Sequence, residues 1–455
     1  MKKQVLSALA FCSALGIAQA QTDVTKEYLV NPSFETLKAA DGTTDVAVKT
    51  KLESGLYGWE ISKLLDNQFS NYQVESEASG SSTGIPVNGI IKPSQGEFYY
   101  FNRQGWGNVD GSELKTSTSK NLPIGTYYAV IDYKAADFSN NNDASKSGTT
   151  IGIKAENATN ELLGENTAVR RAYSTLTSNS DPYMVNAAWN ELGTMFTVTE
   201  PTTVTISLVQ NMKNSGRSDI AWDNLRLYQI ENVSENKPMD VSGLITTSNY
   251  YALGGWNIEG GNTFQVNTWS TEGEKDGSGM TTPFIQDHVG KENKAANATI
   301  SHTVNHLIPG IYEVSGLIRV LNEAGGDTPS GATLYANEGS TNACNGEPCT
   351  NGVYGTYTVK GTVGTDGVLT FGIKVANANF NWVSFKNFKL QYLGAASIEQ
   401  LQATLKEKIE EAKAYVENCP KGIAAIVNAA ITQGNDAQNS DSEDVLNKAI
   451  AALTQ

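Results

Sequence analysis

The residues of this sequence that could take part in chemistry are aromatic rings set among polar side chains. Sugars present C–H faces that stack on Trp or Tyr, while Asp, Asn and Arg bind their hydroxyl groups. Segments that mix these residue types are therefore candidate sugar-binding segments. The candidate ligand-binding residues are Arg103, Trp106, Asp110, Trp189, Trp269, Arg319 and Trp382.

The same rings could instead fill a hydrophobic core. Trp106 and Trp269 lie in polar segments, where core packing and ligand binding fit the sequence equally well. Trp59 and Trp256 each follow a glycine at the same position of an internal repeat, which favours a buried structural role. Trp382 has no aromatic counterpart in the first copy of that repeat, which favours a role specific to the second copy.

Signatures of catalysis are weak. The chain has three histidines, and two of them, His302 and His306, have the spacing that chelates a metal ion on a helix. Their neighbours favour a strand, on which the two rings would stand about 13 Å apart at ~3.3 Å per residue. The segment 80–84 formally matches a nucleophile elbow, but it lies in a low-complexity stretch with no strand-turn-helix context. We expect a non-catalytic protein; a glycoside hydrolase or lyase with an unrecognised carboxylate pair is the alternative.

No cofactor is expected, and a structural Ca²⁺ is the ion that the sequence leaves as a possibility. Residues 137–143 and 274–278 are rich in the hard oxygen ligands that Ca²⁺ prefers, without EF-hand spacing, although such loops are more often solvated turns. Cys344 and Cys349 flank a short segment with Gly and Pro, which predicts a disulfide bond in an oxidising compartment. A metal half-site there would need a second ligand pair nearby.

The N-terminus predicts export. Met1-Lys2-Lys3 is basic, residues 5–17 form an apolar stretch too short to span a bilayer, and Ala18-Gln19-Ala20 has the small residues of a cleavage site. We expect cleavage before Gln21 and a mature protein that is secreted, periplasmic or held at the cell surface. No later apolar run approaches the length of a membrane span.

The charge limits the partners. Lys and Arg number 33 against 48 Asp and Glu, a formal charge of −15 that becomes −17 once residues 1–20 are removed. A chain that acidic has no electrostatic means of binding a phosphate backbone or an anionic bilayer. We expect no nucleic-acid partner, and a neutral ligand such as a glycan rather than an acidic one.

An internal repeat predicts two similar domains. Each copy has an opening segment that leads to Gly-Trp, a turn that ends in Gly-x-Tyr at Tyr127 or Tyr312, and a closing hairpin. The hairpin ends in Trp222-Asp-Asn-Leu-Arg-Leu-Tyr228 in one copy and Phe385-Lys-Asn-Phe-Lys-Leu-Gln391 in the other. Short segments of period 2, punctuated by Gly and Pro, are typical of antiparallel β-sandwiches.

After residue 394 the apolar period changes to 3.6, which predicts three short amphipathic helices. Ser397 and Gln400 form a capping-box pattern, and Gly434 is expected to end the second helix. The expected fold is mainly β. Its parts are a signal peptide at 1–20, jelly-roll β-sandwiches at 21–232 and 239–394, and a three-helix bundle at 395–455.

The opening Leu29-Val-Asn-Pro-Ser-Phe-Glu35, the Gly-Trp and the closing hairpin resemble the galactose-binding-like jelly-roll family, to which many carbohydrate-binding modules belong. Residues 381–390 are similar to repeats in secreted proteins of gut Bacteroidetes, and the tail resembles the three-helix modules appended to them. The resemblance implies tandem modules that bind a polysaccharide, where two weak sites would gain avidity. The same fold also serves adhesion, so the alternative is an adhesin or scaffold that binds a protein partner through the helical tail.

Overall fold

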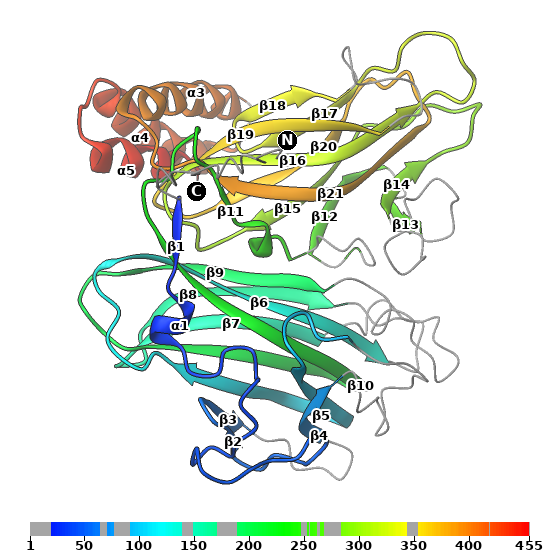
Figure 1. Cartoon of the computed structure of the whole chain (residues 1–455). Helices are drawn as coiled ribbons and strands as arrows, with labels where there is room; N and C mark the ends of the chain where they lie inside the picture. Colours follow the sequence, from blue (N-terminus) through cyan, green and yellow to red (C-terminus); the bar gives the residue numbers. More distant parts are fainter. Residues whose placement is uncertain are drawn as a thin grey trace, which may run out of the picture.

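Two β-sandwiches lie one against the other in the computed structural model, and three helices pack beside the second sandwich (Figure 1). The strand pairs of the described residues are all antiparallel, and they build four layers in two sandwiches, as the sequence predicts. The structure describes residues 20–63, 71–76, 92–138, 149–170, 189–246, 253, 255–261, 264–267, 284–343, 354–417 and 419–454.

The first sandwich is one continuous sheet folded over on itself. Its elements are β1 (Gln21–Asp23), α1 (Thr25–Tyr28), β2 (Gly55–Leu56), β3 (Trp59–Lys63), β4 (Asn71–Ser76), β5 (Phe98–Ser117), β6 (Gly125–Phe138), β7 (Thr149–Asn157), β8 (Leu162–Arg170), β9 (Asn190–Val198) and β10 (Val204–Ile230). The long strands β5 and β10 pair with each other in both layers. Front sheet 1 has the order β4-β5-β10-β6-β9, and back sheet 1 has the order β2-β3-β5-β10-β7-β8.

The second sandwich repeats this order in two separate sheets. Its elements are β11 (Met239–Asp240), η2 (Ser242–Leu244), β12 (Trp256–Gly260), β13 (Gln265–Asn267), β14 (Phe284–His288), β15 (Ala298–Val304), β16 (Gly310–Leu321), β17 (Ala332–Ala336), β18 (Gly339–Asn342), β19 (Gly355–Val363), β20 (Leu369–Val375) and β21 (Trp382–Tyr392). Front sheet 2 has the order β13-β14-β21-β16-β19, and back sheet 2 has the order β12-β15-β20-β17-β18.

The closing motif of the repeat forms the same irregularity in both copies. The pairing of β6 with β10 shifts register after Asp223, and that of β16 with β21 shifts between Ser315 and Leu317. At each shift an asparagine adopts a left-handed backbone, Asn224 with φ 55° and Asn387 with φ 54°. Asn tolerates this conformation better than other residues with a side chain. The Asn shared by the two hairpins is therefore a backbone requirement.

Trp59 and Trp256 are buried, which confirms their predicted structural role. Trp59 stacks on Phe34 at 4.8 Å between ring centres, and its Nε1 donates to the Asn31 carbonyl at 2.8 Å. Trp256 packs among His302 and three phenylalanine rings. Both indoles belong to the sandwich cores rather than to a surface.

The two sandwiches share an apolar core. Tyr128 and Val130 of β6 and Met195 of β9 belong to the same buried cluster as the residues of the second sandwich. The hydroxyl of Tyr312 in that sandwich lies 3.6 Å from the Met195 sulfur. The Nδ2 of Asn166 on β8 donates to the carbonyls of Gly193 and Leu244, one from each side of the junction. Buried packing of this kind holds the two sandwiches in one orientation.

The C-terminal bundle has the three predicted helices: α3 (Ile398–Val416), α4 (Lys421–Ala437) and α5 (Glu443–Thr454). The Ser397–Gln400 capping box is present. The prediction that Gly434 ends the second helix is wrong, because α4 continues to Ala437. A Cβ at Gly434 would lie 3.0 Å from Ile409, so the missing side chain lets α3 and α4 approach closely. None of the described helices is long and apolar enough to cross a membrane.

Candidate ligand-binding faces

The structure describes three of the predicted ligand-binding side chains: Trp189, Arg319 and Trp382. Arg103, Trp106 and Asp110 belong to β5, of which only the backbone is described at these positions. Trp269, the 80–84 segment and the predicted Cys344–Cys349 disulfide lie outside the described residues, as do most residues of the two candidate calcium loops. Their roles stay predictions.

Arg319 and Trp382 lie together on the outer face of front sheet 2. Arg319 alternates along β16 with core residues, and Trp382 lies on the neighbouring strand β21. The guanidinium carbon is 4.2 Å from the Trp382 ring centre and 5.1 Å from that of Tyr354. The Ser384 hydroxyl accepts hydrogen bonds from Arg319 Nε at 3.1 Å and from the Tyr354 hydroxyl at 3.0 Å. These contacts hold a buried cation against two half-buried rings.

His288 on β14 completes the surroundings of Trp382. The two rings stack at 4.6 Å, and His288 Nε2 donates to Glu323 at 2.7 Å. The hydrogen bond from His288 is the main cause that lowers the pKa of Glu323. Trp382 Nε1 in turn donates to the Gln286 side chain at 3.0 Å. Sequence reasoning missed His288 and Glu323, because only the pairing of β14 and β16 with β21 brings them to the ring.

Front sheet 1 has a matching arrangement around Trp189. The Lys134 ammonium group lies 5.4 Å from the Trp189 ring centre. Tyr99 meets the same indole edge-on, at 6.2 Å and 69° between ring planes, and its hydroxyl donates to Glu75 at 2.9 Å. Trp189 is half-buried, and its Nε1 donates to the Lys92 carbonyl at 2.9 Å.

The two cations occupy equivalent positions of the repeat. Lys134 pairs across the sheet with Ala221, the residue before Trp222 of the closing motif. Arg319 pairs with Ser384, the residue before Phe385 at the corresponding position of the second motif. Both side chains are 3% exposed. Each sandwich therefore places a buried cation at the same point of its front sheet.

The rings beside the cations are equivalent as well. Trp189 immediately precedes β9, and Tyr354 immediately precedes the corresponding strand β19. Phe284 meets Tyr354 edge-on at 6.4 Å and 70°, nearly the geometry between Tyr99 and Trp189. We call each set of a cation and its rings a cation–ring site: Lys134, Trp189 and Tyr99 in front sheet 1, and Arg319, Tyr354, Phe284 and the additional ring Trp382 in front sheet 2.

The charges beside the two sites differ. In front sheet 1, Asp132 accepts two hydrogen bonds from Arg226, and its strand partner Asp223 accepts backbone N–H bonds from Ser94 and Gln95. Burial raises the pKa of Asp223 to about 8. In front sheet 2 the residue matching Asp223 is Lys386, whose ammonium group lies 4.7 Å from the Tyr354 ring centre. The two sites are thus alike in geometry but not in their surroundings.

The histidine pair of the sequence lies elsewhere, at the junction of the sandwiches. His302 is on β15, as predicted, and its Nδ1 donates to the Gly255 carbonyl at 2.9 Å. The expectation that His306 continues the strand is wrong, because β15 ends at Val304 and His306 lies in a turn with φ 59°. Among the described residues, no three His, Cys, Asp or Glu side chains gather as a metal-binding group.

No protein-family model matches the chain, and no curated protein matches it either. Among solved structures, it is similar to the CBM22-1–CBM22-2 tandem domain of Xyn10C from Paenibacillus barcinonensis, with 10% identity, coverage of 84% of this chain and 99% of that one, and a TM-score of 0.24. TmCBM61 in complex with β-1,4-galactotriose has 15% identity, coverage of 44% and 97%, and a TM-score of 0.25. The Stig cyclase Fisc from Fischerella sp. TAU has 12% identity, coverage of 44% and 95%, and a TM-score of 0.28. These are distant likenesses to β-sandwich proteins, and the architecture described above rests on the strand pairings themselves.

Proposed function

We propose that this chain is an exported, non-catalytic protein that binds glycans through the cation–ring sites of its two front sheets. The observation that carries the proposal is the recurrence of one arrangement, a buried cation against a half-buried ring, on the outer faces of both sandwiches. Neither Trp189 nor Trp382 belongs to a buried core cluster, so core packing does not account for these rings. A half-exposed Trp or Tyr offers a sugar the flat apolar surface on which its C–H face stacks.

The shared core gives the two sites a fixed separation. Because the Tyr312–Met195 contact and the surrounding apolar cluster join the sandwiches, the two sites do not move apart as they would on a flexible linker. A polymer that spans both sites is bound twice, and its apparent affinity rises without any new contact. We therefore expect tighter binding to a polysaccharide than to a short oligosaccharide of the same linkage.

Affinity electrophoresis of residues 21–455 through gels that contain xylan, galactan, mannan or soluble β-glucan tests this function. We expect one of these neutral polymers to retard the protein, and the double variant Trp189→Ala/Trp382→Ala to lose most of the retardation. Tyr415→Ala is the control, since Tyr415 is an exposed aromatic residue on α3, away from both sites. Equal retardation of the double variant and the wild type would refute the assignment of the sites.

A second candidate function, binding of a protein partner through the helices, has one observation in its favour. The first half of α4 is largely exposed, and Ile423 and Ile426 are 44% and 73% exposed. Exposed apolar side chains that lie together mark interaction surfaces. Immobilised wild type and the variant Ile423→Glu/Ile426→Glu can be compared for capture of surface proteins. A partner that the variant loses while its glycan binding persists would establish this role.

A further inference from the structure

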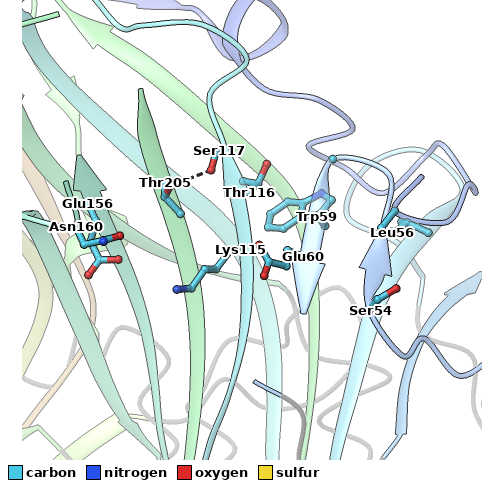
Figure 2. A pocket seen from close by; sticks show the side chains of 12 residues that line it. Ser54, Leu56, Trp59, Glu60, Lys115, Thr116, Ser117, Glu156, Asn160 and Thr205 are labelled. Carbon is cyan, nitrogen blue, oxygen red and sulfur yellow. Dashed lines mark hydrogen bonds between the residues drawn. The ribbon is translucent and has the colours of Figure 1, made fainter. Parts of the chain in front are cut away.

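We infer that the first sandwich has a second glycan site, on the opposite side from its cation–ring site; this rests on the proposed function. The outer face of back sheet 1 is hollowed into a groove of about 570 Å³ (Figure 2). Its volume is in the range of small-molecule sites. The residues that we call the groove are Ser54, Leu56, Gly58, Glu60, Lys115, Ser117, Glu156, Asn160 and Thr205.

The groove has a low floor between two walls. Figure 2 shows Lys115, Ser117 and Thr205 on strands β5 and β10, between the β2–β3 hairpin and the end of β7. The small side chains of Ser117 and Thr205 keep this part of the floor low, and their hydroxyls lie 2.9 Å apart in a hydrogen bond. From β3 to β7 the floor spans three strand spacings, about 14 Å at ~4.8 Å each. Glu60 and Glu156 lie on opposite walls.

The second sandwich has the same hydroxyl pair, beside its contact with the first sandwich. Thr303 pairs with Thr370 on back sheet 2 as Ser117 pairs with Thr205 on back sheet 1, and their hydroxyls are again 2.9 Å apart. Thr303 lines a smaller hollow whose other side is Glu165, Asn166 and Thr167 of β8, from the first sandwich. His306 Nε2 lies 3.7 Å from Glu165 Oε1 across this junction. In the second copy this hollow is thus bordered by the first sandwich, while the groove on back sheet 1 is bordered by its own sandwich.

The side chains of the groove suit a neutral, hydroxyl-rich ligand. The Lys115 ammonium group is 3.2 Å from Glu113, so its charge is compensated, while Glu60 and Glu156 add acceptors and negative charge. That charge disfavours uronic acids and sulfated sugars. The Trp59 ring belongs to the core and offers no stacking face. Recognition therefore depends on hydrogen bonds from hydroxyl, carboxylate and amide groups to a neutral oligosaccharide.

Isothermal titration of residues 21–455 with β-1,4-linked hexasaccharides of glucose, xylose, mannose and galactose tests the groove. The variant Ser117→Ala/Thr205→Val removes the floor hydroxyls, and Thr205→Trp fills the groove. Thr303→Val/Thr370→Val is the matched control, because it removes the equivalent and similarly exposed pair of the second sandwich, which lies outside the groove. We expect both groove variants to weaken one binding event at least tenfold, and the control to leave it unchanged, with equal melting temperatures showing that all variants fold.

The same titration on Trp189→Ala/Trp382→Ala separates this site from the front-sheet sites. If that variant loses binding while both groove variants bind as wild type, the groove assignment is wrong and the proposed function stands. If only the groove variants lose binding, the groove is the glycan site and the front-sheet assignment is wrong. Absence of binding to every hexasaccharide overturns both.

Discussion

The guanidinium carbon of Arg319 lies 4.2 Å from the ring centre of Trp382, on the outer face of a sheet whose inner face is apolar. The partner strand brings the two residues together, and Ser384, two residues after Trp382, accepts a hydrogen bond from Arg319 Nε. A guanidinium stacks on rings and donates in a fixed plane, which an ammonium group cannot do.

Arg319→Lys is expected to weaken glycan binding at the second sandwich about tenfold, equivalent to ~1.4 kcal/mol. The charge is kept, but the hydrogen bond to Ser384 and the planar contact with Trp382 are lost. Titration with the best hexasaccharide measures the change. Lys134→Arg is the matched variant in the first sandwich, and we expect it to preserve binding there. Unchanged affinity for Arg319→Lys would show that the arginine does not position the rings.

Asp223→Asn is expected to make the protein more stable than the wild type, by an amount that grows as the pH rises. The pKa of Asp223 is about 8 in the folded protein because of burial, against an ordinary value of 3.8. Between these values the folded state holds a proton that the unfolded state has released, so stability falls as the pH rises through this window. The amide resembles the protonated acid and does not titrate. Thermal melts should give equal melting temperatures near pH 4 and an advantage for the variant that grows up to pH 8.

His302 is expected to make the fold sensitive to acid. Burial lowers its pKa below the ordinary 6.5, against the effect of its hydrogen bond to the Gly255 carbonyl. Below pH 6.5 the imidazole binds a proton more readily in the unfolded chain than in the folded protein. The free energy of unfolding therefore decreases as the pH is lowered. Melting curves of wild type and His302→Gln between pH 4.5 and 7.5 test this. The variant should lose less stability on acidification; parallel profiles would mean that His302 does not titrate differently on unfolding.

Gly434→Ala is expected to destabilise the helical bundle by roughly 1–3 kcal/mol, the usual cost of overpacking a core. The added Cβ would lie 3.0 Å from Ile409 and 3.1 Å from Leu453. Gly422→Ala on the same helix is the control, because nothing lies within 4 Å of its Cβ. There we expect a gain of about 0.5–1 kcal/mol from helix propensity. Urea unfolding followed by circular dichroism at the helix band measures both, and the same sign for both variants would contradict the packing argument.

The local pattern of the sequence determined the fold class and the cores. Alternation of period 2 predicts strands because side chains alternate between the two faces, and the Gly-Trp of each copy marks a buried indole. The change to period 3.6 and the Ser397–Gln400 box likewise predict the helices, because helix capping depends on residues close in the chain. Trp382 and Arg319 stand out by residue type and position alone. Gly434 does not follow the local rule, since packing against Ile409 outweighs its tendency to end a helix.

Only the tertiary structure decided which residues meet. Tyr99, Lys134 and Trp189 come from three separate strands or their ends, and their counterparts in the second copy are different residue types, so alignment of the two copies cannot find them. These residues meet because strands far apart in the sequence pair in a particular register. The contact between the sandwiches is also long-range: β8 of the first sandwich borders the hollow beside Thr303, while the equivalent Ser117 lies in the groove of back sheet 1. Local periodicity contains no information about such contacts, because they depend on which faces the folded domains present to each other.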